Sequence, residues 1–298
     1  MNTTGPHCLR CHDTHVFIHL ISGQRYARAR RCDCTPSPCP TCDDSRFVLR
    51  YDEHDRETAI PCPECGSLNR RLELFNEARI PKRYLHSRLH AQDQDEENSK
   101  AFGLLEATLR SLPHRLRQTE SQNTGPILKG MVLMGPPGTG KTHLMSGFTY
   151  QCTVELGVSC VFQGFSELLH ELRQGYSNDK SDMEIIEPHL QADVLVIDDL
   201  GKGRNSDWEL SILDTLISER YNRDRLIMVT TNYTEHEETT LQERVLRRDR
   251  GESEQFMADT LRRRVGERIY SRLREMCYFE ELLGRDRRQD SEFEQLPA

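Results

Sequence analysis

The sequence contains no long apolar run and no excess of basic residues. None of its apolar segments approaches the roughly 20 residues that a membrane-spanning helix requires, and 40 lysines and arginines are outnumbered by 48 acidic residues. The formal net charge of −8 excludes a generally basic nucleic-acid binder, so any contact with nucleic acid must be local. The first residues also lack the charged and apolar regions of a signal peptide. We therefore expect a cytoplasmic protein without a membrane partner.

Cysteine is scarce beyond residue 65, where only Cys152, Cys160 and Cys277 occur. These three stand in apolar surroundings and are expected to be small core residues. The remaining cysteines form two similar copies of one pattern, in which a cysteine pair, a short β-hairpin and a second cysteine pair follow one another. They are Cys8, Cys11, Cys32 and Cys34 in the first copy and Cys39, Cys42, Cys62 and Cys65 in the second. Neither copy is long enough to bury a core, so we predict that each holds a zinc ion.

The spacing supports the second zinc site more directly than the first. Two C-x-x-C pairs separated by a hairpin are typical of a zinc ribbon, whereas the pair at 32 and 34 is one residue tighter. A histidine at position 7, 12 or 15 could therefore replace one thiolate in the first site. Pairing of the outer cysteine pairs with each other, and of the inner pairs with each other, stays open. Disulfides are the alternative, but they are rare in the cytoplasm.

The alternation of apolar segments indicates an α/β fold with a parallel sheet flanked by helices. We expect a zinc-binding module over residues 1–66, a helical linker over 67–125 and the α/β domain over 126–298. Strands are predicted at 131–134, 158–162, 194–197 and 226–230. Helices are predicted at 66–80, 98–112, 141–156, 165–173 and 208–221, with a polar connection at 118–125.

A phosphate-binding loop is the strongest motif. It follows a predicted strand, opens a predicted helix and matches G-x-x-x-x-G-K-[ST]. Backbone N–H groups of such a loop surround a β-phosphate, Lys141 reaches the β- and γ-phosphates, and Thr142 binds Mg²⁺. We therefore predict an ATP site made of Gly135, Pro136, Pro137, Gly138, Thr139, Gly140, Lys141, Thr142 and His143.

Two further strands end in polar residues. Asp198 and Asp199 follow the apolar segment 194–197, where Asp198 is placed to hold Mg²⁺ and Asp199 to activate the attacking water. Asn232 follows the strand at 226–230 and could reach the γ-phosphate or that water. Acids and amides also end strands for purely structural reasons, but their order after the phosphate loop favours catalysis.

The order of these motifs, completed by Gly266-Glu-Arg268-Ile-Tyr-Ser-Arg272-Leu, resembles the AAA+ ATPases of the DnaC/DnaI helicase-loader family. The motifs are shared in part with the transposition-helper ATPases of insertion sequences. The resemblance implies an AAA+ core, in which Arg272 is the arginine finger that enters a neighbouring subunit's ATP site. Arg268 is a second candidate contact, with a solvated helix charge as the alternative.

The resemblance also implies contacts with single-stranded DNA. Ser206 and Trp208 occupy positions that follow the acidic motif, and Tyr176 lies near another aromatic position of the family. Stacking of Trp208 on bases would tolerate any sequence. Packing of the same tryptophan at the start of a helix is an equally supported alternative.

The function implied by the resemblance is ATP-dependent loading of a DnaB-type replicative helicase onto single-stranded DNA by a homo-oligomer. Slow, assembly-dependent hydrolysis of ATP with Mg²⁺ would accompany it. One alternative is an IstB-like transposition helper that remodels DNA and recruits a transposase. Another is a zinc-ribbon adaptor that senses ATP without significant hydrolysis.

Overall fold

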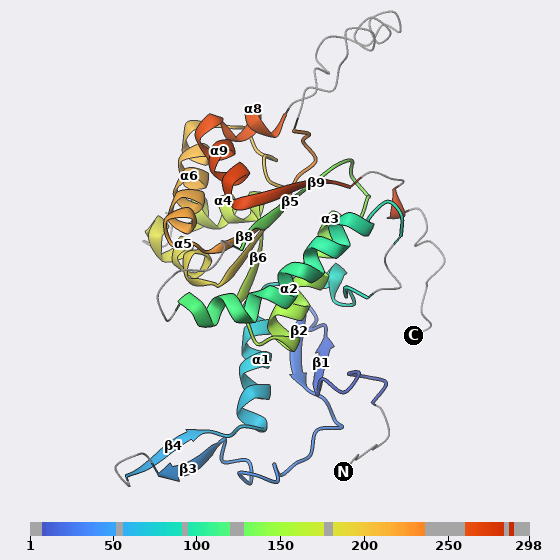
Figure 1. Cartoon of the computed structure of the whole chain (residues 1–298), viewed down its shortest axis with the longest axis vertical. Helices are drawn as coiled ribbons and strands as arrows, with labels where there is room; N and C mark the ends of the chain where they lie inside the picture. Colours follow the sequence, from blue (N-terminus) through green and yellow to red (C-terminus); the bar gives the residue numbers. More distant parts are fainter. Residues whose placement is uncertain are drawn as a thin grey trace, which may run out of the picture. The chain divides into compact units, whose positions relative to one another are not determined.

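The computed structural model describes residues 8–51, 56–90, 95–119, 128–175, 181–235, 260–282 and 286–288 (Figure 1). The chain divides into two compact units. One comprises residues Met1–Arg88 and Ser146–Cys160, and the other comprises Leu89–Met145 and Val161–Ala298. The predicted segments 1–66, 67–125 and 126–298 follow different limits and remain a prediction about separately folding domains. Across the described ranges, none of the helices is both long and apolar enough to cross a membrane.

The first unit contains two antiparallel hairpins. The first hairpin pairs β1 (Val16–His19) with β2 (Arg28–Arg31), and the second pairs β3 (Phe47–Tyr51) with β4 (Glu57–Pro61). Helix α1 (Cys65–Glu77) follows β4, and the short 3₁₀ helix η1 (Lys82–Tyr84) follows α1. The hairpins thus lie between the cysteine pairs, as the repeated pattern predicts.

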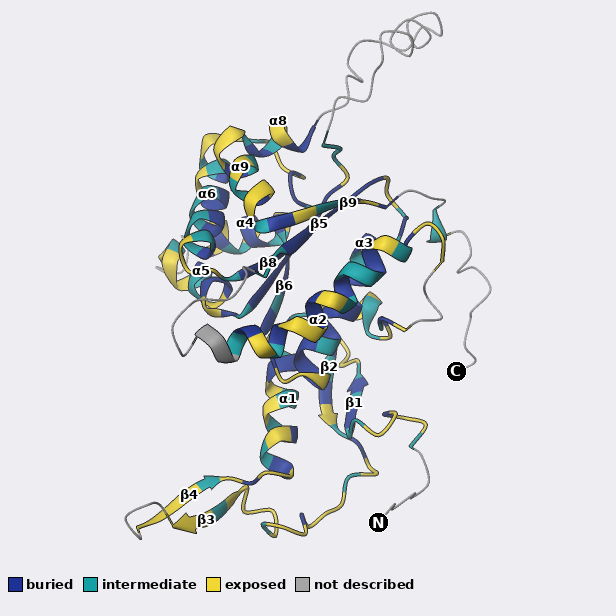
Figure 2. Ribbon diagram, in the orientation of Figure 1, coloured by how far each residue is buried: buried dark blue, intermediate teal, exposed yellow. Residues whose placement is uncertain are grey.

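A small apolar core joins the first hairpin to α1. The alternating strand residues Val16 and Ile18 are buried together with Leu68 and Phe75 of the helix. Asn76 closes the contact, since its amide donates to the carbonyl of Ala29 and accepts from the N–H of the same residue, at 3.1 and 2.8 Å. Among its described residues the second hairpin has no comparable core: the side chains at 47, 49 and 51 are exposed, and the hairpin appears mainly yellow in Figure 2. Only the cysteine cluster at its base is buried, so its fold depends on that cluster.

The second unit is built on a five-stranded sheet in the order β6-β7-β8-β5-β9. The strands are β5 (Gly130–Met134), β6 (Cys160–Gly164), β7 (Val194–Asp198), β8 (Leu226–Thr230) and β9 (Cys277–Glu281). The pairings of β7 with β8, β8 with β5, and β5 with β9 are parallel. Strands β5 and β8 are buried along their whole length, as expected for a parallel sheet covered on both faces.

Helices cover both faces of this sheet (Figure 1). One face is covered by α2 (Ser99–Thr119), whose buried residues recur every three or four positions from Ala101 to Leu112, and by the start of α3 (Lys141–Tyr150). The other face carries α4 (Phe165–Gly175), α5 (Asp182–Gln191), α6 (Asp207–Asn222) and α9 (Glu267–Met276), preceded by the short α8 (Leu261–Val265). The predicted α/β class with a parallel sheet is confirmed.

Several predicted boundaries were wrong. The strand expected at 158–162 begins at Cys160, because a π-helical turn, η3 (Gln151–Glu155), ends the helix expected to reach 156. The helix expected at 98–112 continues past Pro113 to Thr119. Pro113 lies inside α2 and does not end the helix. The last strand, β9, and helix α5 were not predicted.

Arg220 is the largest fully buried side chain, and it joins α5, α6 and β8. Its two terminal nitrogens donate hydrogen bonds to the carbonyls of His189, Leu190, Ala192, Asp193 and Leu226. Three of these carbonyls lie at the end of α5, where a helix leaves its last carbonyls without internal partners. One guanidinium therefore satisfies a helix end and fixes it to the sheet.

Replacing Arg220 with methionine should lower the free energy of unfolding by roughly 3 kcal/mol or more, because several buried carbonyls would lose their donors at about 1–3 kcal/mol each. Urea unfolding followed by circular dichroism would measure the change. Arg223→Ala is the matched control and should cost less than about 0.5 kcal/mol, because Arg223 follows the last residue of α6 and forms a solvent-accessible ion pair with Glu219 at 3.1 Å. Equal effects of both variants would contradict this role.

Candidate functional site

The loop between β5 and α3 turns on three glycines. Gly135, Gly138 and Gly140 have φ angles of 133°, 87° and 97°, a region that side-chain-bearing residues rarely adopt. At Gly135 a Cβ atom would also lie 2.3 Å from the carbonyl oxygen of Leu282, so space alone requires glycine there. Thr139 stabilises the turn by donating to the carbonyl of Pro136 at 3.0 Å. The residue after the motif, His143, is exposed on α3. The loop thus has the strand, turn and helix that the motif requires.

Lys141 is buried at the first position of α3. Its Nζ donates to the carbonyls of Gly135 and Pro136, both at 2.7 Å, so the ammonium lies within the loop. Burial lowers the pKa of Lys141 to about 8, while the charges of Asp199 and Asp198 act in the opposite direction. A buried cation in a loop of turned backbone is suited to an anionic ligand.

Asp198 accepts two hydroxyl hydrogen bonds on one oxygen. The Oγ1 of Thr142, from α3, donates to Asp198 Oδ1 at 3.0 Å, and the Oγ1 of Thr230, from the end of β8, donates to the same oxygen at 2.6 Å. Burial raises the pKa of Asp198, which these hydrogen bonds partly offset. The structure therefore brings together Thr142 and Asp198, which were predicted to share Mg²⁺. A hydroxyl and a carboxylate at the edge of a phosphate loop fit that ion's preference for oxygen.

Asp199 lies beside Asp198 but in a different conformation. Its φ of 56° is left-handed, and its N–H donates to Thr230 Oγ1 at 3.0 Å. The carboxylate forms an ion pair with Lys202, whose Nζ lies 3.1 Å from Oδ2. The residue expected to activate water is thus held at the site by Thr230 and has a lysine for its partner.

Thr230 is a residue of the candidate site that was not predicted from the sequence. Its hydroxyl contacts both acidic residues, whereas the predicted Asn232 lies two residues beyond the end of β8 and is exposed. Thr231 turns the chain between them by donating to the carbonyl of Leu200 at 2.8 Å. The Thr-Thr-Asn sequence was recognised, but nothing in it showed which of the three polar residues faces Asp198. The roles of Asp199 and Asn232 remain predictions.

Arg272, the predicted finger, is held within its own subunit. Its Nη1 lies 2.9 Å from Asp214 Oδ1 and also donates to Ser218, and its guanidinium lies over the ring of Tyr221. The neighbouring candidate, Arg268, is mostly exposed and lies 3.5 Å from the same carboxylate oxygen. Both arginines therefore project from α9 toward Asp214 on α6.

The predicted DNA contacts receive structural roles where they are described. Ser206 caps α6, since its side chain accepts the N–H of Glu209. Trp208 is half-buried against the main core, and Arg173 of α4 stacks on its ring at 5.0 Å. This packing supports the structural alternative for the tryptophan. Tyr176 lies outside the described residues.

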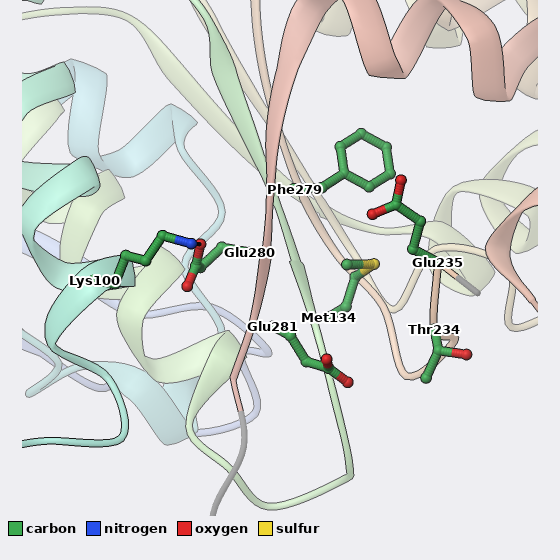
Figure 3. A pocket seen from close by; sticks show the side chains of 7 residues that line it. All are labelled: Lys100, Met134, Thr234, Glu235, Phe279, Glu280 and Glu281. Atoms are coloured by element: carbon green, nitrogen blue, oxygen red, sulfur yellow. Dashed lines mark ion pairs between the residues drawn. The ribbon is translucent and has the colours of Figure 1, made fainter. Parts of the chain in front are cut away.

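A pocket of about 280 Å³ opens next to the end of β5 (Figure 3). Two of its three carboxylates are engaged, because Glu280 pairs with Lys100 at 2.5 Å and Glu235 pairs with Arg274 at 2.7 Å. No residue of the phosphate loop lines it. The candidate ATP site is therefore defined by the loop and the acidic strand end rather than by this pocket.

The eight N-terminal cysteines form two clusters, one for each copy of the repeat. Within each cluster the four sulfur atoms lie within 4.8 Å of one another. The clusters are Cys8, Cys11, Cys32 and Cys34, and Cys39, Cys42, Cys62 and Cys65. This arrangement excludes the alternative in which outer pairs and inner pairs combine. All eleven cysteines are free thiols, so the disulfide alternative is also wrong.

Both clusters fit a tetrahedral zinc ion. Four sulfurs at 2.3 Å from zinc stand about 3.8 Å apart. In the first cluster Cys8–Cys32 is 3.8 Å and Cys11–Cys34 is 3.4 Å, and in the second Cys39–Cys62 is 4.0 Å and Cys42–Cys65 is 3.3 Å. N–H groups of Cys11 and Arg10 lower the pKa of Cys8 to about 7, which favours the thiolate, whereas burial raises the pKa of Cys11 and of Cys34 in the same cluster. His15 Nδ1 lies 3.5 Å from Cys34 Sγ, next to the cluster, which is already complete with four thiols. His12 and His15 are therefore not needed as ligands, and His7 lies outside the described residues.

Comparison with known proteins finds a family model that matches part of the chain, and relatives that are similar in sequence. Residues 122–249 match the family model of the IstB-like ATP binding protein. The phage-like element PBSX protein XkdC of Bacillus subtilis (strain 168) is 32% identical over 113 residues, which are 35% of this chain and 40% of that protein. The replicative helicase loader DnaC of Escherichia coli (strain K12) is 28% identical over 138 residues, which are 46% of this chain and 56% of that protein.

The resemblance predicted from the motifs is confirmed. Over residues 122–249 the chain is similar to the IstB-like ATP binding proteins. A crystal structure of the DnaC helicase loader is also similar, with 26% identity and a TM-score of 0.47 over 68% of this chain and 99% of that one. The matched regions span only 40% and 56% of the two curated relatives.

The affinity of the candidate site for ATP should fall with rising pH. With a pKa of about 8, Lys141 is mostly protonated at pH 7 and mostly neutral at pH 9, and only the protonated form attracts the phosphates. The apparent affinity for Mg²⁺-ATP should therefore drop about tenfold between these values. Isothermal titration calorimetry in buffers of different ionisation enthalpy should also show proton uptake on binding near pH 8. A pH-independent affinity would contradict the lowered pKa.

The protein purified under reducing conditions should contain two zinc ions per chain, measured by plasma mass spectrometry. Cys11→Ser and Cys62→Ser should each remove about one zinc, because each change takes one thiolate from a four-sulfur site. Cys160→Ser, at a buried cysteine outside both clusters, is the control and should keep both ions. Loss of both ions from either single variant would indicate one shared site instead.

Proposed function

We propose that this protein is an ATP-dependent loader of a DnaB-type replicative helicase onto single-stranded DNA, acting as a homo-oligomer with ATP sites shared between subunits. The observation that carries the ATPase part is the meeting of Thr142 and Thr230 on one oxygen of Asp198. These two hydrogen bonds bring the phosphate loop together with the ends of β7 and β8. The loader part is supported by the match with DnaC, a replicative helicase loader, over nearly half of the chain.

The zinc-binding unit is the proposed contact for the helicase. It has its own core and both cysteine clusters, and its second hairpin exposes Phe47, Leu49 and Tyr51 on alternate positions of one strand. Exposed large apolar side chains gathered on one face are typical of protein contact surfaces.

Shared ATP sites require Arg272 to leave its place in the free subunit. Its ion pair with Asp214 is only partly buried, so a triphosphate, with its greater negative charge, can compete for the guanidinium. Arg272 entering a neighbouring ATP site would stabilise charge on the transferring phosphoryl group. Hydrolysis would then depend on assembly, as proposed for a loader.

Lys202 offers a link between DNA and hydrolysis. Its side chain forms an ion pair with Asp199. Its carbonyl accepts a hydrogen bond at 2.8 Å from the hydroxyl of Ser166 in α4. A DNA phosphate that attracts Lys202 would free the Asp199 carboxylate for the attacking water. Single-stranded DNA would then stimulate turnover.

The decisive experiment is a loading assay. The replicative helicase of the source organism is given circular single-stranded DNA coated with single-strand binding protein, and unwinding of an annealed strand is followed. The full-length protein should start unwinding in the presence of ATP, and Lys141→Ala should not, since it cannot hold the nucleotide. Arg272→Ala should bind ATP normally but lose most of its assembly-dependent hydrolysis, whereas Arg223→Ala should behave like the wild type.

The outcomes separate the competing functions. A protein that does not act on the helicase but stimulates a transposase on duplex DNA would be an IstB-like transposition helper, which the match over residues 122–249 favours as the second candidate. No hydrolysis with helicase and DNA both present would indicate the adaptor. Unchanged turnover in Arg272→Ala would refute the finger assignment alone.

A further inference from the structure

The first hairpin carries aromatic rings and arginines on the side that points away from its core. Every second residue of β1 is buried with α1, so the residues between them point outward. On this outward side Phe17 is paired with Arg30, and His19 with Arg28, across the two strands. Arg10, which lies between the cysteines of the first pair, also reaches the Phe17 ring. We call these five residues the basic aromatic face.

The rings and guanidiniums of the basic aromatic face contact one another. The rings of Phe17 and His19 are parallel within 8°, and their centroids are 6.2 Å apart. The guanidiniums of Arg30 and Arg10 lie over the Phe17 ring, at 4.8 and 5.6 Å from its centroid. Rings interleaved with arginines suit a single strand of nucleic acid, because bases stack on the rings and phosphates bind the guanidiniums.

The face keeps a positive charge when its own ion pairs are counted. Asp33 is the partner of both Arg10 and Arg30, at 2.7 and 2.9 Å, and one carboxylate cannot neutralise two guanidiniums. Arg28 donates to two uncharged groups, a side-chain amide and a backbone carbonyl. The pairs with Asp33 are exposed and therefore weak, so phosphates can compete for both arginines. In a chain with a net charge of −8, this is a local basic surface.

The second hairpin shows that the fold of such a hairpin does not require this face. Counted from the preceding cysteine pair, Val48 is the equivalent of Phe17. Val48 is paired with Ile60, whereas Phe17 is paired with Arg30. Both hairpins nevertheless form between cysteine pairs of one cluster. The ring and the arginine opposite it are therefore not needed to form the hairpin.

We propose that the basic aromatic face binds single-stranded nucleic acid. Arg10, Arg28 and Arg30 contact successive phosphates of the strand. A base takes the place of the Arg30 guanidinium over the Phe17 ring when Arg30 leaves Asp33 for a phosphate. This inference goes beyond the proposed function, which gives the zinc-binding unit a contact with the helicase only. DNA and RNA share the phosphates and bases on which this binding depends.

Photo-crosslinking of the full-length protein tests where the strand lies. The probes are a short oligo-deoxythymidine that contains 5-iododeoxyuridine and an oligo-uridine that contains 5-iodouridine. Mass spectrometry of the peptides should place cross-links on Phe17 or His19 with at least one probe, and the probe that gives more of them tells DNA from RNA. Because the cross-link identifies the residue, strand binding elsewhere in the chain does not hide this contact. Cross-links confined to the ATPase unit, or none at all, would overturn the proposal.

Fluorescence anisotropy with the same strands separates the rings from the charges. Changing Arg10→Gln and Arg30→Gln together should lower the affinity about tenfold and reduce the slope of log K against log salt by about 1.4, or about 0.7 for each lost phosphate contact. Phe17→Leu should also lower the affinity about tenfold, but with an unchanged salt slope, because stacking alone is lost. Arg50→Gln, at an exposed arginine of the second hairpin, is the matched control and should change neither quantity.

Three results in solution would contradict the proposal. They are equal affinity for a duplex of the same strand, equal competition by polyglutamate, and wild-type affinity in both the Phe17→Leu and the double arginine variant. The first would show contacts with phosphates alone, and the second an acidic protein as the partner. Cross-linking of the wild type decides even where a variant does not fold. Cross-links on Phe17 in a protein that does not load the helicase would refute the proposed function and support this surface.

Discussion

The ammonium group of Lys141 is buried beside the loop that follows β5, and a buried cation is stable only near negative charge. The arrangement of the surrounding elements depends on this requirement. Its own loop supplies only two carbonyl oxygens, and burial lowers its pKa to about 8. For Asp198, burial disfavours the negative charge and therefore raises the pKa. A magnesium-bound triphosphate would relieve both, because the phosphates bring anionic charge to the lysine and the metal brings positive charge to the carboxylate. Strands β5, β7 and β8, the phosphate loop, and the hydroxyl groups of Thr142 and Thr230 hold Lys141 and Asp198 in position.

Metal has the corresponding role in the N-terminal unit. Helix α1 begins at Cys65, the last ligand of the second cluster, and carries Leu68 and Phe75 into the core with the first hairpin. A zinc ion at this cluster would fix the start of the helix and the base of the second hairpin together. Because the exposed residues of that hairpin have no core beneath them, the surface proposed to meet the helicase would depend on the metal rather than on packing.

The sequence allowed good prediction wherever a residue's chemistry is local. The glycines of the phosphate loop, the repeated cysteines and the apolar run at 226–229 can each be interpreted from a few neighbouring residues. Strand β9 was missed because Cys-Tyr-Phe-Glu-Glu resembles neither a buried run nor a clean alternation; it becomes a strand by pairing with β5. Thr230 could not be found for the same reason. It acquires its role from Asp198, a partner that the fold brings close, and sequence spacing does not show such a partner.

The two cysteine clusters differ in their exposure to solvent. Cys34 is exposed and Cys8 half-exposed in the first cluster, whereas in the second only Cys42 is more than slightly accessible. Chelators and oxidants would therefore reach the first cluster sooner. Under zinc limitation the protein would lose its metal in two stages, and the hairpin with the exposed aromatic residues would be the later one to come apart. A partly depleted population would consist mainly of molecules that still hold the second ion.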